Sequence, residues 1–235
     1  MAGNGVDAVI FDWGGTLTAW HDIDFHAESV ALAYAVREHP EGHEVSAARL
    51  REAGERVWGR SRDEQRSAVI GDLFEEAGLD HDPDLLGAYF DFWEPHTHTD
   101  PEVAPLWTAL HERGIRVGVL SNTIWPREWH RGFFARDDIL DLIDGDVYTS
   151  EIPWTKPSEH AFAAAMDAVG AVDPERCVYV GDRLFDDIWG AQNAGMRAIH
   201  IPHSTIPAAQ VGHTEGVPDA VAARLAEIVD VVDRW

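Results

Sequence analysis

The stretch of residues 8–18 constrains the fold most, because it joins an apolar run to one carboxylate, two glycines and a threonine. Its first four residues predict a strand that is buried on both faces, as in a parallel sheet. Asp12 then stands at the carboxyl end of that strand, where open α/β sheets place their ligands. Gly14 and Gly15 allow a sharp turn close to a ligand, and the Thr16 hydroxyl joins a row of amides suited to an anion. Taken alone, the stretch also fits an ordinary turn.

Beyond residue 100 the chain alternates between apolar runs and amphipathic stretches. The patterns predict strands at 115–120, 146–149, 177–180 and 197–201, and helices at 101–113, 129–142, 158–169, 186–194 and 219–232. Strands that alternate with helices through short connections favour a parallel sheet with helices on both faces. The fold class predicted is therefore α/β, with a doubly wound parallel, Rossmann-like sheet.

Between the first strand and residue 97 the sequence has a different character. Apolar residues recur there at three- and four-residue spacing, which predicts helices at 24–38, 46–59, 63–77 and 83–93, with breaks at 40–42, 61–62 and 80–83. An all-helical insertion follows from this pattern. We expect an α/β core formed by residues 1–18 and 98–235, and an inserted helical cap formed by residues 19–97.

Composition narrows the function classes. The formal charge of −24 argues against nucleic acid and anionic membranes as partners, because both require a basic surface. No apolar run reaches the length of a membrane span, and the first residues lack the pattern of a secretory signal. The single cysteine, Cys177, cannot form an internal disulfide, which fits a reducing compartment. We expect a cytoplasmic protein, monomeric or homodimeric, that binds a small molecule.

Chemically distinctive residues follow three of the later strands. Ser121 follows the strand at 115–120, Lys156 is the sole lysine of the chain and precedes a predicted helix, and residues 181–187 contain three aspartates after the strand at 177–180. All of them reach the same sheet edge as Asp12 if the strands are parallel. A carboxylate nucleophile, a hydroxyl, a lysine and an acidic cluster can converge there on one phosphoryl group and one Mg²⁺ ion.

This order of motifs resembles the haloacid dehalogenase superfamily of hydrolases. The segment at 180–196, Val-Gly-Asp-Arg-Leu-Phe-Asp-Asp-Ile-Trp-Gly-Ala-Gln-Asn-Ala-Gly-Met, follows the family pattern almost throughout. The likeness covers residues 6–202, with a helical cap inserted in the expected place after the first motif.

The resemblance implies how a phosphorylated substrate is bound and attacked. Asp12 would be the nucleophile that forms an aspartyl-phosphate, and Ser121 and Lys156 would bind the phosphoryl oxygens. Lys156 would also offset the charge of the carboxylates around it. Three further residues would supply supporting contacts: Gly15, Thr16 and Asn122.

The resemblance also implies a Mg²⁺ site. Asp12, Asp182 and the backbone carbonyl of Gly14 would be its ligands, which suits a cation that takes oxygen donors and shares them with phosphate. Asp187 would support the ligands from behind, or Asp186 in its place. The alternative for Asp186 is a cap at the start of the following helix.

Gly14 is the main departure from the family pattern. Phosphatases of the family carry a second aspartate there as general acid and base, a role worth roughly 10²–10⁴ in rate. A Mg²⁺-dependent phosphatase with altered acid/base chemistry is the favoured interpretation. The alternatives are a haloacid dehalogenase, which needs no such aspartate, a phosphonate hydrolase, for which the cap lacks the required lysine, and a non-catalytic phosphate-binding protein. His21, Asp22 and His26 are candidates for a substitute proton donor.

Tryptophans flank the proposed active-site segments. Trp13, Trp20, Trp125 and Trp154 all lie within a few residues of a motif. They suggest an aromatic-walled pocket for a ring-bearing substrate, and the alternative for each of them is ordinary packing in the core.

Overall fold

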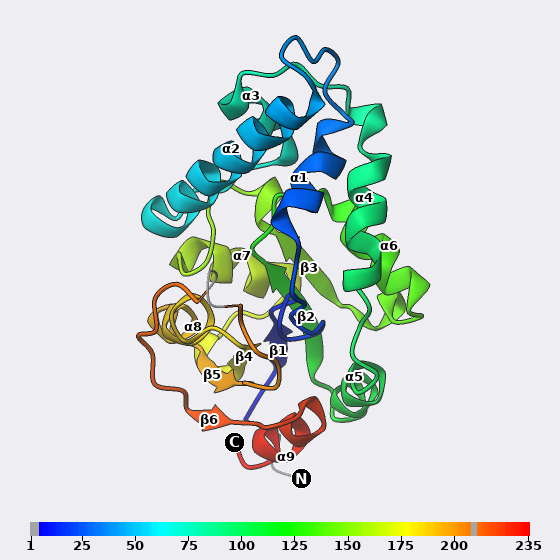
Figure 1. Cartoon of the computed structure of the whole chain (residues 1–235). Coiled ribbons are helices and arrows are strands. Elements are labelled where there is room, and N and C mark those ends of the chain that lie inside the picture. The colour runs from blue at the N-terminus through cyan, green and yellow to red at the C-terminus, as the bar shows by residue number, and fades with distance from the viewer. Residues whose placement is uncertain (1–4, 208–210) are drawn as a thin grey trace.

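A six-stranded sheet forms the centre of the protein (Figure 1). The computed structural model describes residues 5–207 and 211–235. The sheet has the order β3-β2-β1-β4-β5-β6, and every neighbouring pair is parallel. Its strands are β1 (Ala8–Phe11), β2 (Arg116–Ser121), β3 (Gly145–Tyr148), β4 (Cys177–Gly181), β5 (Arg197–His200) and β6 (Ala220–Val221). The predicted α/β class with a parallel sheet is confirmed.

The register of the strands aligns the ends that carry the motifs. Phe11 lies level with Val119 of β2 and with Val180 of β4. Because the three strands are parallel, the residues that follow these positions leave the sheet at one edge. Asp12 and Asp182 therefore come from neighbouring strands at that edge.

Helices cover both faces of the sheet. Alternate side chains of a strand point to opposite faces, so Val9 and Phe11 pack in one core cluster and Ala8 and Ile10 pack in another. The first cluster includes residues of α5 (Val103–Glu112), α6 (Arg127–Arg136) and α9 (Ile228–Val232). The second includes residues of α7 (Glu159–Ala168) and α8 (Gly190–Asn193).

A block of four α-helices lies between β1 and α5 in the sequence and gathers at one end of the molecule (Figure 1). Its members are α1 (Phe25–Ala33), α2 (His43–Glu64), α3 (Ile70–Ala77) and α4 (Gly87–Trp93), together with two 3₁₀ turns at Pro83–Leu85 and Glu94–His96. The helices and 3₁₀ turns are the regular structure of this block, as the sequence predicts. None of the described helices has the length and apolar composition needed to cross a membrane.

The predicted break at 61–62 is wrong. Helix α2 continues through Ser61, because neither Ser61 nor Arg62 breaks a helix and Ser61 is buried with its carbonyl accepting a hydrogen bond from the Thr155 hydroxyl. The helix ends instead at Glu64, and the backbone of the next residue, the C-cap Gln65, is left-handed, with φ of 54°. The following helix accordingly begins at Ile70, not at residue 63.

The predicted helix at 219–232 is also wrong in its first half. Ala220 and Val221 pair with β5 as the sixth strand, and a 3₁₀ turn at Leu225–Glu227 precedes the short α9. Apolar spacing did not separate these possibilities, because the chain completes the sheet edge through pairing that the sequence does not encode locally. Four other predicted helices differ in extent. The helix at 24–38 is reduced to α1, and 83–93 is divided into the 3₁₀ turn at Pro83–Leu85 and α4. The helix at 129–142 becomes α6, which begins at Arg127, and a 3₁₀ turn at Leu140–Leu142, and 186–194 becomes α8 preceded by a π-helix at Leu184–Trp189.

Candidate active site

Asp12 is the buried carboxylate at the end of β1. Its side chain is almost fully enclosed, and its backbone N–H donates to the Val180 carbonyl at 2.9 Å, which fixes it to β4. Burial raises the pKa of Asp12 to about 6, and the nearby charge of Lys156 opposes that rise. An anion at this depth therefore depends on its cationic neighbour.

Lys156 supplies that cation and makes three hydrogen bonds. Its Nζ donates to Asp12 Oδ1 at 2.6 Å, to Asp187 Oδ1 at 2.7 Å and to the Tyr179 hydroxyl at 2.9 Å. Burial alone would lower the pKa of Lys156, but the charges of Asp12 and Asp187 outweigh it and hold that pKa well above its usual value. The ammonium group is thus kept protonated between two carboxylates.

Asn122 holds the loop that carries Lys156. Its Oδ1 accepts a hydrogen bond from the Lys156 backbone N–H at 2.8 Å, and its Nδ2 donates to the Lys156 carbonyl at 3.1 Å. The sequence predicts a phosphate contact for Asn122, whereas the structure engages both ends of its amide with the protein. Ser121, the preceding residue, is buried at the last position of β2.

Asp182 and Asp187 complete a cluster of carboxylates with Asp12. One oxygen from each of the three residues lies within 4.8 Å of the others, and all three residues are buried. Asp182 Oδ1 is buried and has no hydrogen-bond partner among the described residues, while its Oδ2 accepts from the Trp20 indole at 2.6 Å. Burial raises the pKa of Asp182 to about 8, and the charges of Asp12 and Asp187 add to the rise.

This cluster can bind a metal ion. Three buried carboxylates surround a single lysine, so negative charge is in excess, and a bound cation would neutralise it. Asp182 Oδ1, which has no partner among the described residues, could then serve as a ligand of that cation. The donor set consists of carboxylate oxygens, which suits a hard cation such as Mg²⁺.

The loop after Asp12 has a glycine, Gly15, that is required by both its backbone angle and its surroundings. Gly15 has φ of 90°, and a Cβ atom there would lie 2.2 Å from the Trp20 indole nitrogen, so only glycine fits. The Gly15 N–H donates to the Thr18 carbonyl at 2.8 Å and is therefore not free for phosphate, contrary to the predicted row of open amides. The Thr16 hydroxyl, in contrast, is buried without a hydrogen-bond partner in the described part of the chain.

Gly14 differs from Gly15. A Cβ atom at Gly14 would meet no atom of the described residues within 4 Å, its chain neighbours aside, and the Gly14 backbone lies outside the left-handed region. The absence of a side chain at this position is therefore not imposed by packing around the backbone.

Asp186 and Asp187 have distinct positions. Asp187 Oδ2 accepts from the Arg183 N–H at 2.8 Å, and its other oxygen binds Lys156. Asp186 is only partly buried, and the prediction that it caps a helix is wrong, because the π-helix begins at Leu184 with Arg183 as its N-cap. Of the two, Asp187 is the residue that joins the cluster.

The three candidate proton donors lie on the surface. His21, Asp22 and His26 are exposed. The His21 ring packs 5.0 Å from the His96 ring, and the His26 ring nitrogen lies 3.8 Å from a Glu44 oxygen. In this conformation the histidine rings face surface partners.

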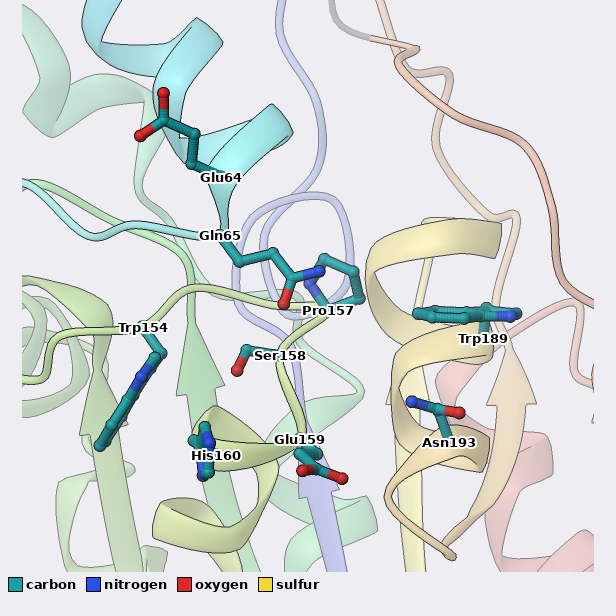
Figure 2. A pocket seen from close by; sticks show the side chains of 9 residues that line it. All are labelled: Glu64, Gln65, Trp154, Pro157, Ser158, Glu159, His160, Trp189 and Asn193. Atoms are coloured by element: carbon teal, nitrogen blue, oxygen red, sulfur yellow. The ribbon is translucent and has the colours of Figure 1, made fainter.

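The four tryptophans do not form one wall. Trp13 and Trp125 are buried with ring centroids 5.7 Å apart, whereas Trp20 lies beside Asp182. Trp154 lines a separate pocket of about 450 Å³, where it and Trp189 stand on opposite sides of Pro157 (Figure 2). The aromatic-walled pocket is therefore not the arrangement in this structure.

Sequence reasoning missed Tyr179 as part of the site. Its hydroxyl accepts from Lys156 Nζ and donates to the Leu120 carbonyl at 3.0 Å, so it links the lysine to β2. The available signal was a hydroxyl-bearing ring within the otherwise aliphatic strand β4. It also missed His203 and Ser204, which both donate to the Gly15 carbonyl, at 3.1 and 3.2 Å.

The site thus consists of one lysine and three buried carboxylates beyond the carboxyl ends of parallel strands, where α/β folds bind their ligands. A family model of haloacid dehalogenase-like hydrolases matches residues 6–195. The chain belongs to this family, and the prediction of a hydrolase is confirmed.

Two curated relatives are phosphatases by name. The glyceraldehyde 3-phosphate phosphatase of Methanopyrus kandleri is 32% identical over 164 residues, which cover 68% of this chain and 69% of the relative. The human phospholysine phosphohistidine inorganic pyrophosphate phosphatase is 35% identical over 77 residues, 33% of this chain and 28% of the relative.

Solved structures share the whole fold. A haloacid dehalogenase-type phosphatase from Thermococcus onnurineus has a TM-score of 0.67 at 21% identity, covering 97% of this chain and 98% of its own. A 2-haloacid dehalogenase from Pseudomonas syringae pv. Tomato has a TM-score of 0.65 at 25% identity, covering 98% and 99%. The fold is thus common to phosphatases and dehalogenases, and it does not separate the two activities.

Proposed function

We propose that this hydrolase is a Mg²⁺-dependent phosphatase that acts on a small phosphomonoester through an aspartyl-phosphate at Asp12. The observation that carries the proposal is the buried cluster of Asp12, Asp182 and Asp187, in which the protein's one lysine binds Asp12 and Asp187 and one oxygen of Asp182 has no partner among the described residues. A dehalogenase has no need of such a cation site, whereas a phosphatase must neutralise a doubly charged substrate.

In the proposed reaction, a carboxylate oxygen of Asp12 attacks phosphorus, and the bond from phosphorus to the leaving oxygen breaks. The leaving group departs with the bonding electrons as an oxyanion and then takes a proton from solvent water. Water then attacks phosphorus of the aspartyl-phosphate, which releases inorganic phosphate and restores the Asp12 carboxylate. Lys156, already bound to Asp12 Oδ1, stabilises the nucleophile as an anion, and we assign to it a contact with a phosphoryl oxygen as well.

Two hydroxyl groups fit a phosphate-binding role. The Thr16 hydroxyl is buried and has no hydrogen-bond partner within residues 5–207 and 211–235, and Ser121 lies at the end of β2 beside β1. We assign both to the phosphoryl oxygens. Asn122 then contributes indirectly, by holding the Lys156 backbone.

The residues that would hold Mg²⁺ are Asp12, Asp182 and the carbonyl of Gly14, with Asp187 fixed behind them by Lys156 and the Arg183 N–H. When bound, the ion would neutralise charge on the phosphoryl oxygens and shield Asp12 from the anion that it attacks.

A carbon–halogen hydrolase is the second candidate. Gly14 favours it, because that reaction expels a halide and needs no proton donor at this position, and the structural likeness to a 2-haloacid dehalogenase is consistent with it. The carboxylate cluster argues against it. The two functions differ in their need for a cation.

For the substrate we propose a small phosphorylated metabolite, since the relative from Methanopyrus kandleri is named for glyceraldehyde 3-phosphate. The four helices α1–α4 are proposed to act as a cap that closes over the substrate, with the boundaries at residues 19–97 expected from the sequence. Cytoplasmic location and a monomeric or homodimeric state also remain predictions from the sequence.

The test is an assay of purified protein with para-nitrophenyl phosphate, in Mg²⁺, in EDTA, and in EDTA followed by excess Mg²⁺. We expect hydrolysis that EDTA abolishes and Mg²⁺ restores. The Asp12→Asn protein, purified in parallel, controls for contaminating phosphatases. Hydrolysis that survives EDTA, or chloride release from a 2-chloro acid without phosphate release from any ester, would reject the proposal and favour the dehalogenase.

A further inference from the structure

Trp20 contacts the proposed cation site although it belongs to none of the motifs. It lies in the connection between β1 and α1, eight residues after Asp12. Its indole Nε1–H donates to Asp182 Oδ2 at 2.6 Å, across a separation of 162 residues in the sequence. This hydrogen bond links the entry to the helical block with the carboxylate that ends β4.

The indole is held in place from several sides. The Trp20 backbone N–H donates to the Ser204 hydroxyl at 3.3 Å, and that hydroxyl donates to the Gly15 carbonyl at 3.2 Å. The Arg183 guanidinium carbon lies 5.1 Å from the centre of the Trp20 ring. Gly15 leaves the space that the indole nitrogen fills, since any Cβ there would collide with it.

The contact divides the two oxygens of Asp182 between two tasks. Oδ2 is bound to the indole, whereas Oδ1 is buried, has no partner in the part of the chain that the structure describes, and belongs to the cluster with Asp12 and Asp187. A carboxylate with one oxygen fixed by a donor cannot rotate freely, so the direction of its second oxygen is set before a cation arrives. Outer partners of this kind orient metal ligands, and their loss typically lowers metal affinity 10–100-fold.

We propose that Trp20 is a positioning residue for the cation site, which fixes Asp182 so that Oδ1 faces the ion. The inference rests on the proposed function and adds to it a residue outside the family motifs. If Trp20 has this role, the orientation of Asp182 depends on the segment that connects β1 to α1.

The test uses Trp20→Phe, which retains an aromatic ring over Arg183 and removes the N–H donor. Mg²⁺ affinity is measured on metal-free protein by isothermal titration calorimetry, which does not depend on turnover. We expect the Kd for Mg²⁺ to rise about 10–100-fold, and the Mg²⁺ concentration for half-maximal activity to rise in parallel, with kcat at saturating Mg²⁺ much less affected. Trp154→Phe, the same exchange in the separate pocket of Figure 2, is the matched control and should leave the Kd unchanged.

A second variant provides a test that does not depend on the folding of the first. Ser204→Ala keeps the Trp20 indole but removes the acceptor of the Trp20 backbone N–H. This substitution should weaken Mg²⁺ binding by a smaller factor, while the circular dichroism in EDTA stays as in the wild type. Wild-type affinity in both variants would overturn the role of Trp20 and leave the proposed function intact. Failure of the wild-type protein itself to bind Mg²⁺ would overturn the cation site and this inference with it.

Discussion

Asp12 and Trp13 are consecutive, yet their side chains enter two different environments. Asp12 joins the charged cluster, which we define as Asp12, Lys156, Asp182 and Asp187. Trp13 joins the aromatic cluster, which we define as Trp13, Tyr89, Trp93, Trp125, His130 and Phe133. Asp12 thus belongs to the proposed reaction, and the next residue belongs to the aromatic packing that connects the helical block to the sheet.

The two clusters are held by different forces. In the charged cluster each contact is directional, with Lys156 donating at 2.6 to 2.9 Å to three acceptors. In the aromatic cluster the contacts are largely between ring faces and edges, such as the stacked pair of Trp13 and Phe133 at 6.1 Å, and the Trp13 indole N–H is buried without a partner among the described residues. Burying charges costs free energy of desolvation, so we attribute the charged cluster to function, whereas packed rings contribute mainly to stability.

The aromatic cluster joins four parts of the chain, the first of which is Trp13 in the loop after β1. Tyr89 and Trp93 come from α4, Trp125 follows β2, and Phe133 lies on α6. Substitutions there should therefore change how firmly the helical block is attached. Substitutions in the charged cluster should change catalysis first.

The largest effect is expected from Asp12→Asn. A neutral amide cannot form the acyl-phosphate, so kcat/KM for para-nitrophenyl phosphate should fall at least about 10⁴-fold. The amide oxygen can still accept from Lys156, so the far-ultraviolet circular dichroism and the melting temperature should stay close to wild type. Retained hydrolysis by a normally folded variant would remove Asp12 from the chemistry.

Lys156→Met should be the most destabilising change within the charged cluster. Methionine approximates the length of lysine but leaves Asp12 and Asp187 buried without their cation, a loss of about 3–5 kcal/mol in the free energy of unfolding. Urea denaturation in EDTA measures it. Arg113→Met, which breaks the more exposed pair with Asp233, is the control and should cost at most about 1 kcal/mol. Equal costs for the two variants would mean that Lys156 does not balance the cluster.

Gly14→Asp should add activity rather than remove it. The structure has room for a side chain there, so the new carboxyl can act as the missing proton donor. Hydrolysis of alkyl phosphates, whose leaving groups need a proton, should rise by up to roughly 10²–10⁴, while para-nitrophenyl phosphate should change little. The dependence of rate on leaving-group pKa should flatten accordingly.

Gly14→Asn, which has the same size and no acidic proton, is the control for that gain. If the wild-type dependence on leaving-group pKa is already shallow and Gly14→Asp does not alter it, another donor operates. Single substitutions of His21, Asp22 and His26 by alanine then test whether a movement of the helical block brings one of them to the site.

The charged cluster was predictable because its chemistry restricts the residue types. The sequence contains a lone lysine, an aspartate after an apolar strand and a Gly-Asp pair after another strand. Parallel pairing of β1 and β4 brings Asp12 and Asp182 together, and Lys156 reaches Asp12 from the segment that follows β3. The parallel register aligns the carboxyl ends of the strands, so residues that follow them meet at one edge of the sheet.

The remaining features depend on contacts between distant segments. Nothing local in residues 219–232 distinguishes a helix from a short edge strand with two turns, and the indole of Trp20 meets Asp182 only after folding. Tyr179 binds Lys156 across 23 residues by way of the sheet. Tertiary partners decide such positions, and intrinsic propensity is too weak to indicate them.

The smallest expected effect is a change of stability with pH, and it arises beside the aromatic cluster and not in the charged one. Glu28 of α1 borders the aromatic cluster and accepts a hydrogen bond from the Tyr89 hydroxyl at 3.1 Å. Burial raises the pKa of Glu28 to about 7 from an ordinary 4.5, and the bond from Tyr89 offsets part of that rise. Between these two values the folded protein binds more protons at Glu28 than the unfolded chain does. The contribution of Glu28 to stability is therefore complete below pH 4.5, declines as pH rises, and is lost above pH 7.

Glu28→Gln removes this titration and keeps an oxygen that can accept from Tyr89. Groups that titrate in both proteins cancel when the two are compared, so the difference in unfolding free energy isolates Glu28. Between pH 4.5 and pH 7.5 that difference should shift in favour of the glutamine variant by on the order of 2 kcal/mol. Urea midpoints across this range, measured in EDTA, give the value, and kcat for para-nitrophenyl phosphate should stay close to wild type. Parallel pH profiles would mean that Glu28 is ionised in the folded protein throughout, and that the aromatic cluster does not exclude water from its carboxyl group.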